Sequence, residues 1–269
     1  MLGLLNYTSP VSYSSHELDL PRRPELWRCR ECSSWYTNNI LPKDVAEGLY
    51  KTGSSGSRWT PTPLEQGKSL AILKQLSAVF RADKKVLDIG CNTGELLDFA
   101  RSRGCNTAGV EFSESCHGPL AEKGHDCFAE LGMVTGRYDV ITAFDVIEHV
   151  YDPPRFFSIC RDLLEDDGVL VLLTGNIHSM CARLCGPYWW YVNFPEHIGF
   201  PSGKFLRNTP GFKLQRQIRT YASLDFVKPV PVVIKRFLLS LYRNGRYAGL
   251  PYEANAMTLY SSDEFKKPR

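Results

Sequence analysis

KVLDIGCNTGE, residues 85–95, is the stretch of this sequence that decides the fold. Its first five residues predict a buried strand, because a short apolar run bounded by glycine is typical of strands covered on both faces. Gly90 and Gly94 permit a tight turn in which the backbone approaches a ligand closely. The residues that follow predict an amphipathic helix whose first N–H groups are free. Strand, turn and helix together predict a cradle for a nucleoside-containing ligand.

Composition narrows the classes of protein. A chain of 269 residues with 43% hydrophobic and 23% charged residues fits one large α/β domain with appendages or two modest domains. A net charge of +3 gives no electrostatic footprint for nucleic acid. No apolar run reaches the ~18 residues of a membrane span. Nine cysteines without a signal peptide predict reduced thiols in a cytoplasmic protein.

Strands and helices alternate after the glycine turn, which predicts a parallel sheet with helices on both faces and a ligand at the carboxyl ends of the strands. The predicted strands after the first cover residues 106–112, 125–129, 138–144, 168–174, 212–221 and 256–260. The predicted helices cover residues 41–50, 61–80, 114–123, 153–164, 202–206 and 232–242.

The N-terminal part shows no hydrophobic period. Residues 1–28 are expected to be an irregular, loosely attached arm. Cys29 and Cys32 form a CxxC, which is half of a tetrahedral zinc site. The nearest further candidates are His16 and Cys91, so we interpret the pair as a packed knuckle without metal.

The turn itself separates two kinds of nucleoside site. A dinucleotide site requires GxGxxG, whereas this chain has GxxxG. The stretch resembles motif I of the class I S-adenosylmethionine-dependent methyltransferases, with Asp88, Gly90 and Gly94 in matching positions. Asn92 stands where that family usually has glycine, and Asn tolerates positive φ better than most residues.

Further motifs follow in the order of that family. Glu111 ends the second strand, where the family places a carboxylate that accepts from both ribose hydroxyls. FDVIEHVYD, residues 144–152, resembles the signature of the subgroup related to ubiquinone-biosynthesis and sugar methyltransferases. LLEDDGVLVLLTGN resembles the same subgroup, with Asp167 in place of its usual first glycine. Relatives with a cysteine knuckle usually carry two CxxC pairs, and this chain has one.

The resemblance implies a fold, a cofactor and a site. The implied fold is a Rossmann-like doubly wound α/β domain with a seven-stranded, mostly parallel sheet. The expected domains are an arm over residues 1–60, a methyltransferase domain over 61–261 with a lid at 176–201, and a tail over 262–269. The implied cofactor is S-adenosylmethionine, and zinc is left open. The residues expected to bind S-adenosylmethionine are Asp88, Gly90, Cys91, Asn92, Thr93, Gly94, Glu111, Phe112, Ser113, Phe144 and Asp145.

Methyl transfer to an alcohol needs alignment and a base that takes the proton. We expect His197, in the lid beside Glu196, to be that base, and His149 is the second candidate. Trp189, Trp190 and Tyr191 are expected to form a wall against the acceptor, or to pack the lid onto the core, and Glu196 is a further expected acceptor-binding residue.

The expected acceptor is a small molecule, with a hydroxyl of a sugar, nucleotide-sugar or surface-glycan precursor preferred, which would place the protein in polysaccharide biosynthesis. A phenolic or quinone-type hydroxyl is the alternative. A methyltransferase-like binding or scaffold protein without activity is a hypothesis of another class. The oligomeric state is not predicted.

Overall fold

The computed structural model describes residues 1–53 except 6, 8, 15 and 21, and residues 76–221 and 254–262. Its centre is a seven-stranded sheet in the order β12-β13-β10-β9-β6-β7-β8. The first five strands in chain order are parallel, and β13 runs antiparallel to both of its neighbours. The strands are β6 (Lys85–Ile89), β7 (Asn106–Val110), β8 (Asp126–Phe128), β9 (Tyr138–Phe144), β10 (Leu164–Gly175), β12 (Phe212–Tyr221) and β13 (Ala254–Ser262). This sheet confirms the predicted doubly wound fold.

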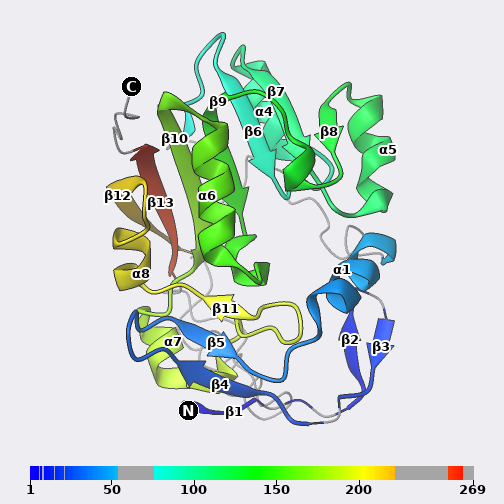
Figure 1. Ribbon diagram of the computed structural model, residues 1–269, viewed down its shortest axis with the longest axis vertical. Coiled ribbons are helices and arrows are strands. Elements are labelled where there is room, and N and C mark those ends of the chain that lie inside the picture. Colours follow the sequence, from blue (N-terminus) through cyan, green and yellow to red (C-terminus); the bar gives the residue numbers. More distant parts are fainter. Residues whose placement is uncertain are drawn as a thin grey trace, which may run out of the picture.

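Helices cover both faces of the sheet. Successive residues of its central strands point to opposite faces, and each face packs against helices in a different hydrophobic cluster. In β10, Leu172 belongs to the cluster that contains α6, whereas Val171 belongs to the cluster that contains α4. Figure 1 shows α6 lying across the sheet and α5 beside β8. The helices are α4 (Glu95–Ser102), α5 (Glu114–Glu122), α6 (Pro153–Leu163) and α8 (Gly203–Arg207), with 3-10 turns η1 (Leu131–Met133) and η2 (Ile147–His149). Double coverage explains why the strand sequences are continuous apolar runs.

A second sheet occupies the N-terminal part, so the expectation that residues 1–28 are irregular was wrong. Its order is β1-β4-β5-β11, all paired antiparallel, and β11 comes from the predicted lid. A separate hairpin joins β2 and β3. The bounds are β1 (Gly3–Leu4), β2 (Val11–Tyr13), β3 (His16–Leu18), β4 (Glu25–Arg28), β5 (Trp35–Thr37) and β11 (Gly199–Phe200). Such two- to four-residue strands carry little periodic signal in sequence.

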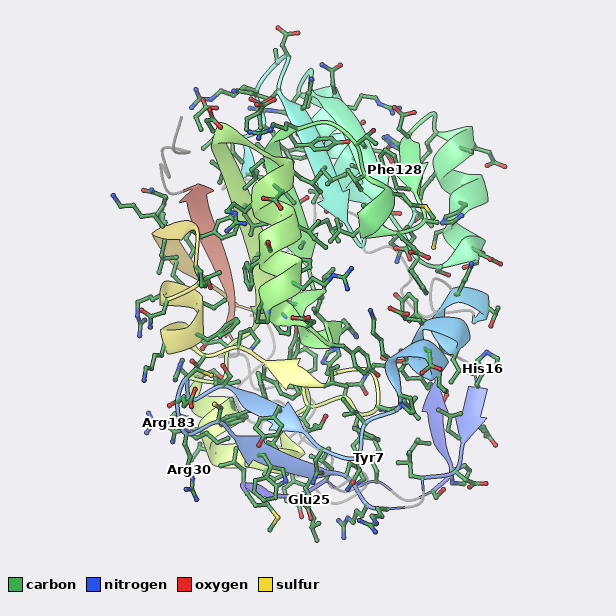
Figure 2. The ribbon with its side chains drawn as sticks, viewed as in Figure 1. Tyr7, His16, Glu25, Arg30, Phe128 and Arg183 are labelled. Carbon is green, nitrogen blue, oxygen red and sulfur yellow. The ribbon has the colours of Figure 1, made fainter. Side chains whose placement is uncertain are left out.

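The lid and the N-terminal strands share one hydrophobic core. Trp189 is 1% exposed and its ring lies 6.3 Å from that of Trp35 in an edge-to-face arrangement. The Tyr7 hydroxyl donates to the carbonyl of Val192 at 3.1 Å, and Figure 2 labels Tyr7 among the N-terminal strands. Figure 1 places these strands with α7 (Met180–Cys185) below the large sheet. We call this unit the lid module; it comprises β1, β4, β5, β11, α7 and η3 (Gly186–Tyr188).

Several predictions meet the edge of the described chain. The predicted helix over 41–50 is α1 (Lys43–Thr52). Most of the predicted helix over 61–80 and all of that over 232–242 lie outside the described residues, and the proposed domain boundaries stay predictions. No helix in the described part of the chain has the length and apolar character that crossing a membrane requires.

Candidate functional site

The glycine turn after β6 adopts left-handed backbone conformations at three positions. The φ angles are 73° at Gly90, 49° at Asn92 and 88° at Gly94, where α4 begins. A Cβ on Gly90 would lie 2.7 Å from Cγ2 of Val146, so the close approach as well as the φ angle requires glycine. Asn92 therefore has a left-handed conformation, which asparagine tolerates better than most other non-glycine residues. Thr93 completes the turn.

Asp88 lies in β6 just before this turn and is 4% exposed. The Thr142 hydroxyl on the neighbouring strand donates to its Oδ1 at 2.6 Å. Burial raises the pKa of the Asp88 carboxyl to about 7, although the hydrogen bond from Thr142 opposes this effect. A cationic group placed beside this buried carboxyl would favour its charged form, because opposite charges attract strongly where water is excluded.

Glu111 directly follows β7, as its role at the end of the second strand predicted. Its two carboxylate oxygens accept from the backbone N–H of Asn92 at 2.9 Å and from that of Ser113 at 2.8 Å. Burial raises the pKa of Glu111, and these two backbone hydrogen bonds oppose the rise. The carboxylate therefore joins the glycine turn to the start of α5.

Aromatic side chains border the same edge of the sheet. The ring of Phe112 lies 6.5 Å from the ring of Tyr50, which belongs to α1. An ion pair of 3.7 Å between Lys51 and Glu114 also holds α1 beside α5. Sequence reasoning missed that α1 brings Tyr50 to the cradle, because sequence periodicity gives no long-range partner for a short helix.

The chain leaves β9 through Phe144 and turns sharply at Asp145. Asp145 has a φ of 52°, and its backbone N–H donates to the carbonyl of Leu173 at 2.8 Å. A non-glycine residue in this region is uncommon and concentrates at functional sites. Its position at the carboxyl end of β9 agrees with the expected ligand edge.

Two acidic side chains meet one tyrosine behind this turn. The Tyr191 hydroxyl lies 2.9 Å from Oδ1 of Asp145 and also hydrogen-bonds Oε1 of Glu148. The Thr174 hydroxyl donates to the other Glu148 oxygen at 3.1 Å. Burial raises the pKa of Glu148 to about 8, and the charge of Asp145 adds to the rise. Sequence reasoning did not select Glu148, although it lies within the DVIEHV signature.

The two candidate bases lie together against this carboxyl cluster. Their imidazole rings are 4.7 Å apart and nearly perpendicular. Nδ1 of His149 contacts the carbonyl of Glu196 at 2.8 Å, and Nδ1 of His197 contacts that of Tyr191 at 2.6 Å. Because a carbonyl only accepts, each Nδ1 carries the proton. Burial lowers the pKa of His197 to about 3, and the nearby charge of His149 is a second, smaller cause of this lowering.

Among the described residues, one group of three side chains of the kinds that bind metals lies close enough to hold an ion. It consists of Glu148, His149 and His197. One ligand atom from each lies within 4.8 Å of the others. This geometry can hold a small cation. Cys29 and Cys32 are free thiols in the turn between β4 and β5, and their assignment as a metal-free knuckle stays a prediction.

The structure places the predicted acceptor wall mainly inside the lid module. Trp189 and Tyr191 are 1% and 3% exposed, and both belong to its core cluster. Trp190 is less buried, and its Nε1 has no hydrogen-bond partner among the residues that the structure describes. The Glu196 carboxylate accepts from the side-chain amide of Asn193 at 2.8 Å. Tyr191 nevertheless reaches the carboxyl cluster, and a contact of these rings with an acceptor stays a prediction.

Curated relatives share part of this sequence. A ubiquinone biosynthesis O-methyltransferase of Dechloromonas aromatica (strain RCB) is 31% identical over 154 residues, which cover 51% of this chain and 66% of that protein. A protein of the same name from Pseudomonas aeruginosa (strain UCBPP-PA14) is 32% identical over 109 residues, which cover 35% of this chain and 46% of that protein. The chain thus spans about half to two thirds of these relatives.

A solved structure and a family match agree on the fold. The magnesium protoporphyrin IX methyltransferase of Synechocystis PCC 6803, solved with bound SAH, superposes with a TM-score of 0.54 at 14% identity and covers 82% of this chain and 100% of that one. A family described as a methyltransferase domain matches residues 65–209, which is more than half of the chain. The match contains the glycine turn, both carboxylates of the cradle and the carboxyl–histidine cluster. The chain therefore belongs to the methyltransferase domain family.

Proposed function

We propose that this protein transfers a methyl group from S-adenosylmethionine to an oxygen atom of a small acceptor. The observation that carries the proposal is the cradle, in which Asp88 and Glu111 flank a left-handed turn at the carboxyl ends of neighbouring parallel strands. Glu111 suits the ribose hydroxyls because a carboxylate accepts two hydrogen bonds at once. Asp88 suits the ammonium group of the methionine part because it is buried without a cation among the described residues.

We propose a phenolic or quinone-type hydroxyl as the acceptor. The names of the curated relatives support this choice, which was the alternative in the sequence analysis. The sugar hydroxyl preferred there has no support from these relatives. Methyl transfer is an in-line displacement, so the site's main task is to align the sulfonium carbon with the acceptor oxygen.

We propose His197 as the base that takes the acceptor's proton. Its Nδ1–H is fixed by the carbonyl of Tyr191, which leaves Nε2 as the proton acceptor. Its lowered pKa keeps it neutral near pH 7, so that Nε2 can accept a proton, but it also makes the imidazole a weak base that needs a neighbouring negative charge as the proton arrives. One Glu148 oxygen lies within 4.8 Å of a His197 ring nitrogen, and the Glu148 carboxyl group, whose raised pKa keeps it mostly protonated at pH 7, stabilises the imidazolium only in its ionised form.

Calorimetry with S-adenosylmethionine tests the cofactor assignment, and no binding at millimolar ligand would overturn it in favour of a scaffold protein.

Product mass spectrometry then tests the acceptor. Catechol-type phenols and nucleotide-sugars are offered separately with the cofactor. A singly methylated phenol supports the proposal, and methylation of nucleotide-sugars alone would overturn the acceptor class.

His197→Ala tests the base. Turnover should fall by ~100-fold or more while cofactor affinity stays within a factor of two or so, because general-base loss affects only the chemical step. His149→Ala is the matched comparison. A larger fall in His149→Ala, with nearly normal turnover in His197→Ala, would transfer the role to His149.

A further inference from the structure

Three cysteines surround the glycine turn. Cys91 lies in the turn, Cys116 in α5 and Cys127 in β8, and they form one buried cluster with Leu97 and Leu120. Cys91 is 3% exposed, whereas Cys127 is only partly buried. The proposed methyl transfer uses none of these three thiols.

Strand register brings two of these sulfur atoms together. Gly109 of β7 pairs with Cys127 of β8 in parallel register, and paired residues of neighbouring strands face the same side of a sheet. Sγ of Cys91 occupies the space above Gly109, since a Cβ built there would lie 2.4 Å from it. Gly109 thus leaves the room in which the Cys91 and Cys127 side chains lie in one cluster, and each thiol shifts the pKa of the other.

We propose that Cys91 and Cys127 are an oxidisable dithiol, which a hydroperoxide converts into a disulfide beneath the glycine turn. Cys127 is the residue oxidised first, because it is the more exposed of the two. The neighbouring Cys91 side chain, together with the charge of His117, lowers the pKa of the Cys127 thiol to about 7. An accessible thiolate next to a second thiol is the arrangement typical of redox-sensitive cysteines.

The chemistry balances in two steps. The Cys127 thiolate attacks the terminal oxygen of the hydroperoxide and becomes a sulfenic acid, while the O–O bond breaks and releases an alcohol or water after protonation. The Cys91 sulfur then attacks the sulfenic sulfur and loses its proton. The S–S bond forms, the S–O bond breaks, and hydroxide leaves with that proton as water. Two thiols are oxidised and one hydroperoxide is reduced.

A disulfide changes the turn because its sulfur atoms are ~2.05 Å apart, which is closer than two free thiols can approach. Cys91 must therefore shift toward β8. Its backbone N–H donates to the carbonyl of Val110 at 3.1 Å, and the next N–H, of Asn92, donates to Glu111 at 2.9 Å. Displacing the N–H groups of Cys91 and Asn92 disturbs the Glu111 carboxylate, which is proposed to hold the ribose. This consequence, unlike the disulfide itself, rests on the proposed function.

The test treats the full-length protein with hydrogen peroxide, blocks remaining thiols, and maps cysteine peptides without reduction. A peptide that joins Cys91 to Cys127, removed by dithiothreitol, is the expected result. A joined peptide through Cys116, or overoxidation of Cys127 alone, would overturn the dithiol. Cys127→Ser should form no such link, and Cys105→Ser is the matched control because its buried thiol lies outside the cluster.

Calorimetry with S-adenosylhomocysteine separates the disulfide from its effect. The oxidised wild type should bind about tenfold more weakly than the reduced protein, and Cys127→Ser should bind equally before and after peroxide. A mapped disulfide with unchanged affinity would overturn the coupling to the turn. Because reduced wild-type protein is measured in the same series, failure of the cofactor assignment appears there as no binding in any sample.

Discussion

The cradle and the lid module differ in how far apart their interacting residues lie in the sequence. The cradle joins Asp88, the turn and Glu111, which lie within one strand–helix–strand unit. The lid module joins Tyr7 to Val192 and Trp35 to Trp189 across most of the chain. The cradle therefore depends on local backbone geometry, whereas the lid module depends on packing between distant segments. Substitutions in the two regions should fail in different ways.

The largest expected effect is on the packing of the lid module. Trp189→Ala should lower the free energy of unfolding by ~3–5 kcal/mol, because it removes a large ring that is 1% exposed. Urea denaturation measures the change. Tyr188→Ala is the neighbouring control, since its side chain is 42% exposed and should cost less than ~1 kcal/mol. Equal effects of the two substitutions would contradict the packing described here.

Asp88→Asn should affect ligand binding rather than packing. The amide keeps the contact with Thr142 but removes the charge, so affinity for S-adenosylhomocysteine should fall by ~10- to 100-fold, on the scale of a charge-assisted hydrogen bond. Calorimetry at neutral pH measures it. Asp166→Asn is the control, since that side chain is fully exposed. An unchanged affinity would remove Asp88 from the cofactor site.

Glu148→Gln should change how stability depends on pH. Because burial raises the pKa of Glu148 to about 8, the folded protein keeps a proton that the unfolded chain has already lost. Stability of the ligand-free protein should therefore fall as pH rises to about 8, and above about 7.5 ordinary histidines are mostly neutral and no longer oppose the fall. The glutamine variant should show a shallower fall, and exposed Glu47→Gln an unaltered one. Thermal unfolding across this range decides, and wild-type stability that increases with pH would contradict the assignment.

The smallest effect is expected at Asn92. Asn92→Gly should change stability by less than ~1 kcal/mol, because glycine adopts a φ of 49° freely. Asn92→Ala should cost ~1–2 kcal/mol more than the glycine variant, since alanine disfavours that region. Urea denaturation compares the two. If alanine is as stable as glycine, the left-handed turn does not limit this position.

Sequence patterns predicted much of the cradle because its constraints are local. Gly90 and Gly94 indicated a turn with positive φ, and Glu111 was placed by its distance after a strand. The lid was predicted as a segment, but its partners were not. Strands of two to four residues, such as β1 and β11, have no detectable period, and β11 pairs with β5, a segment more than 100 residues away.

The sequence by itself therefore determined the alternating fold, the glycine turn and the two carboxylates that flank it, because each follows from residue types within a few positions of one another. Only the tertiary structure decided that Glu148, His149 and His197 meet, that Tyr191 bridges two carboxyl groups, and that Cys127 packs against the cluster that contains Cys91. Those contacts arise where separate strands end at the same edge or lie in register. Their distances depend on the packing of the whole sheet and lid, which no local pattern encodes.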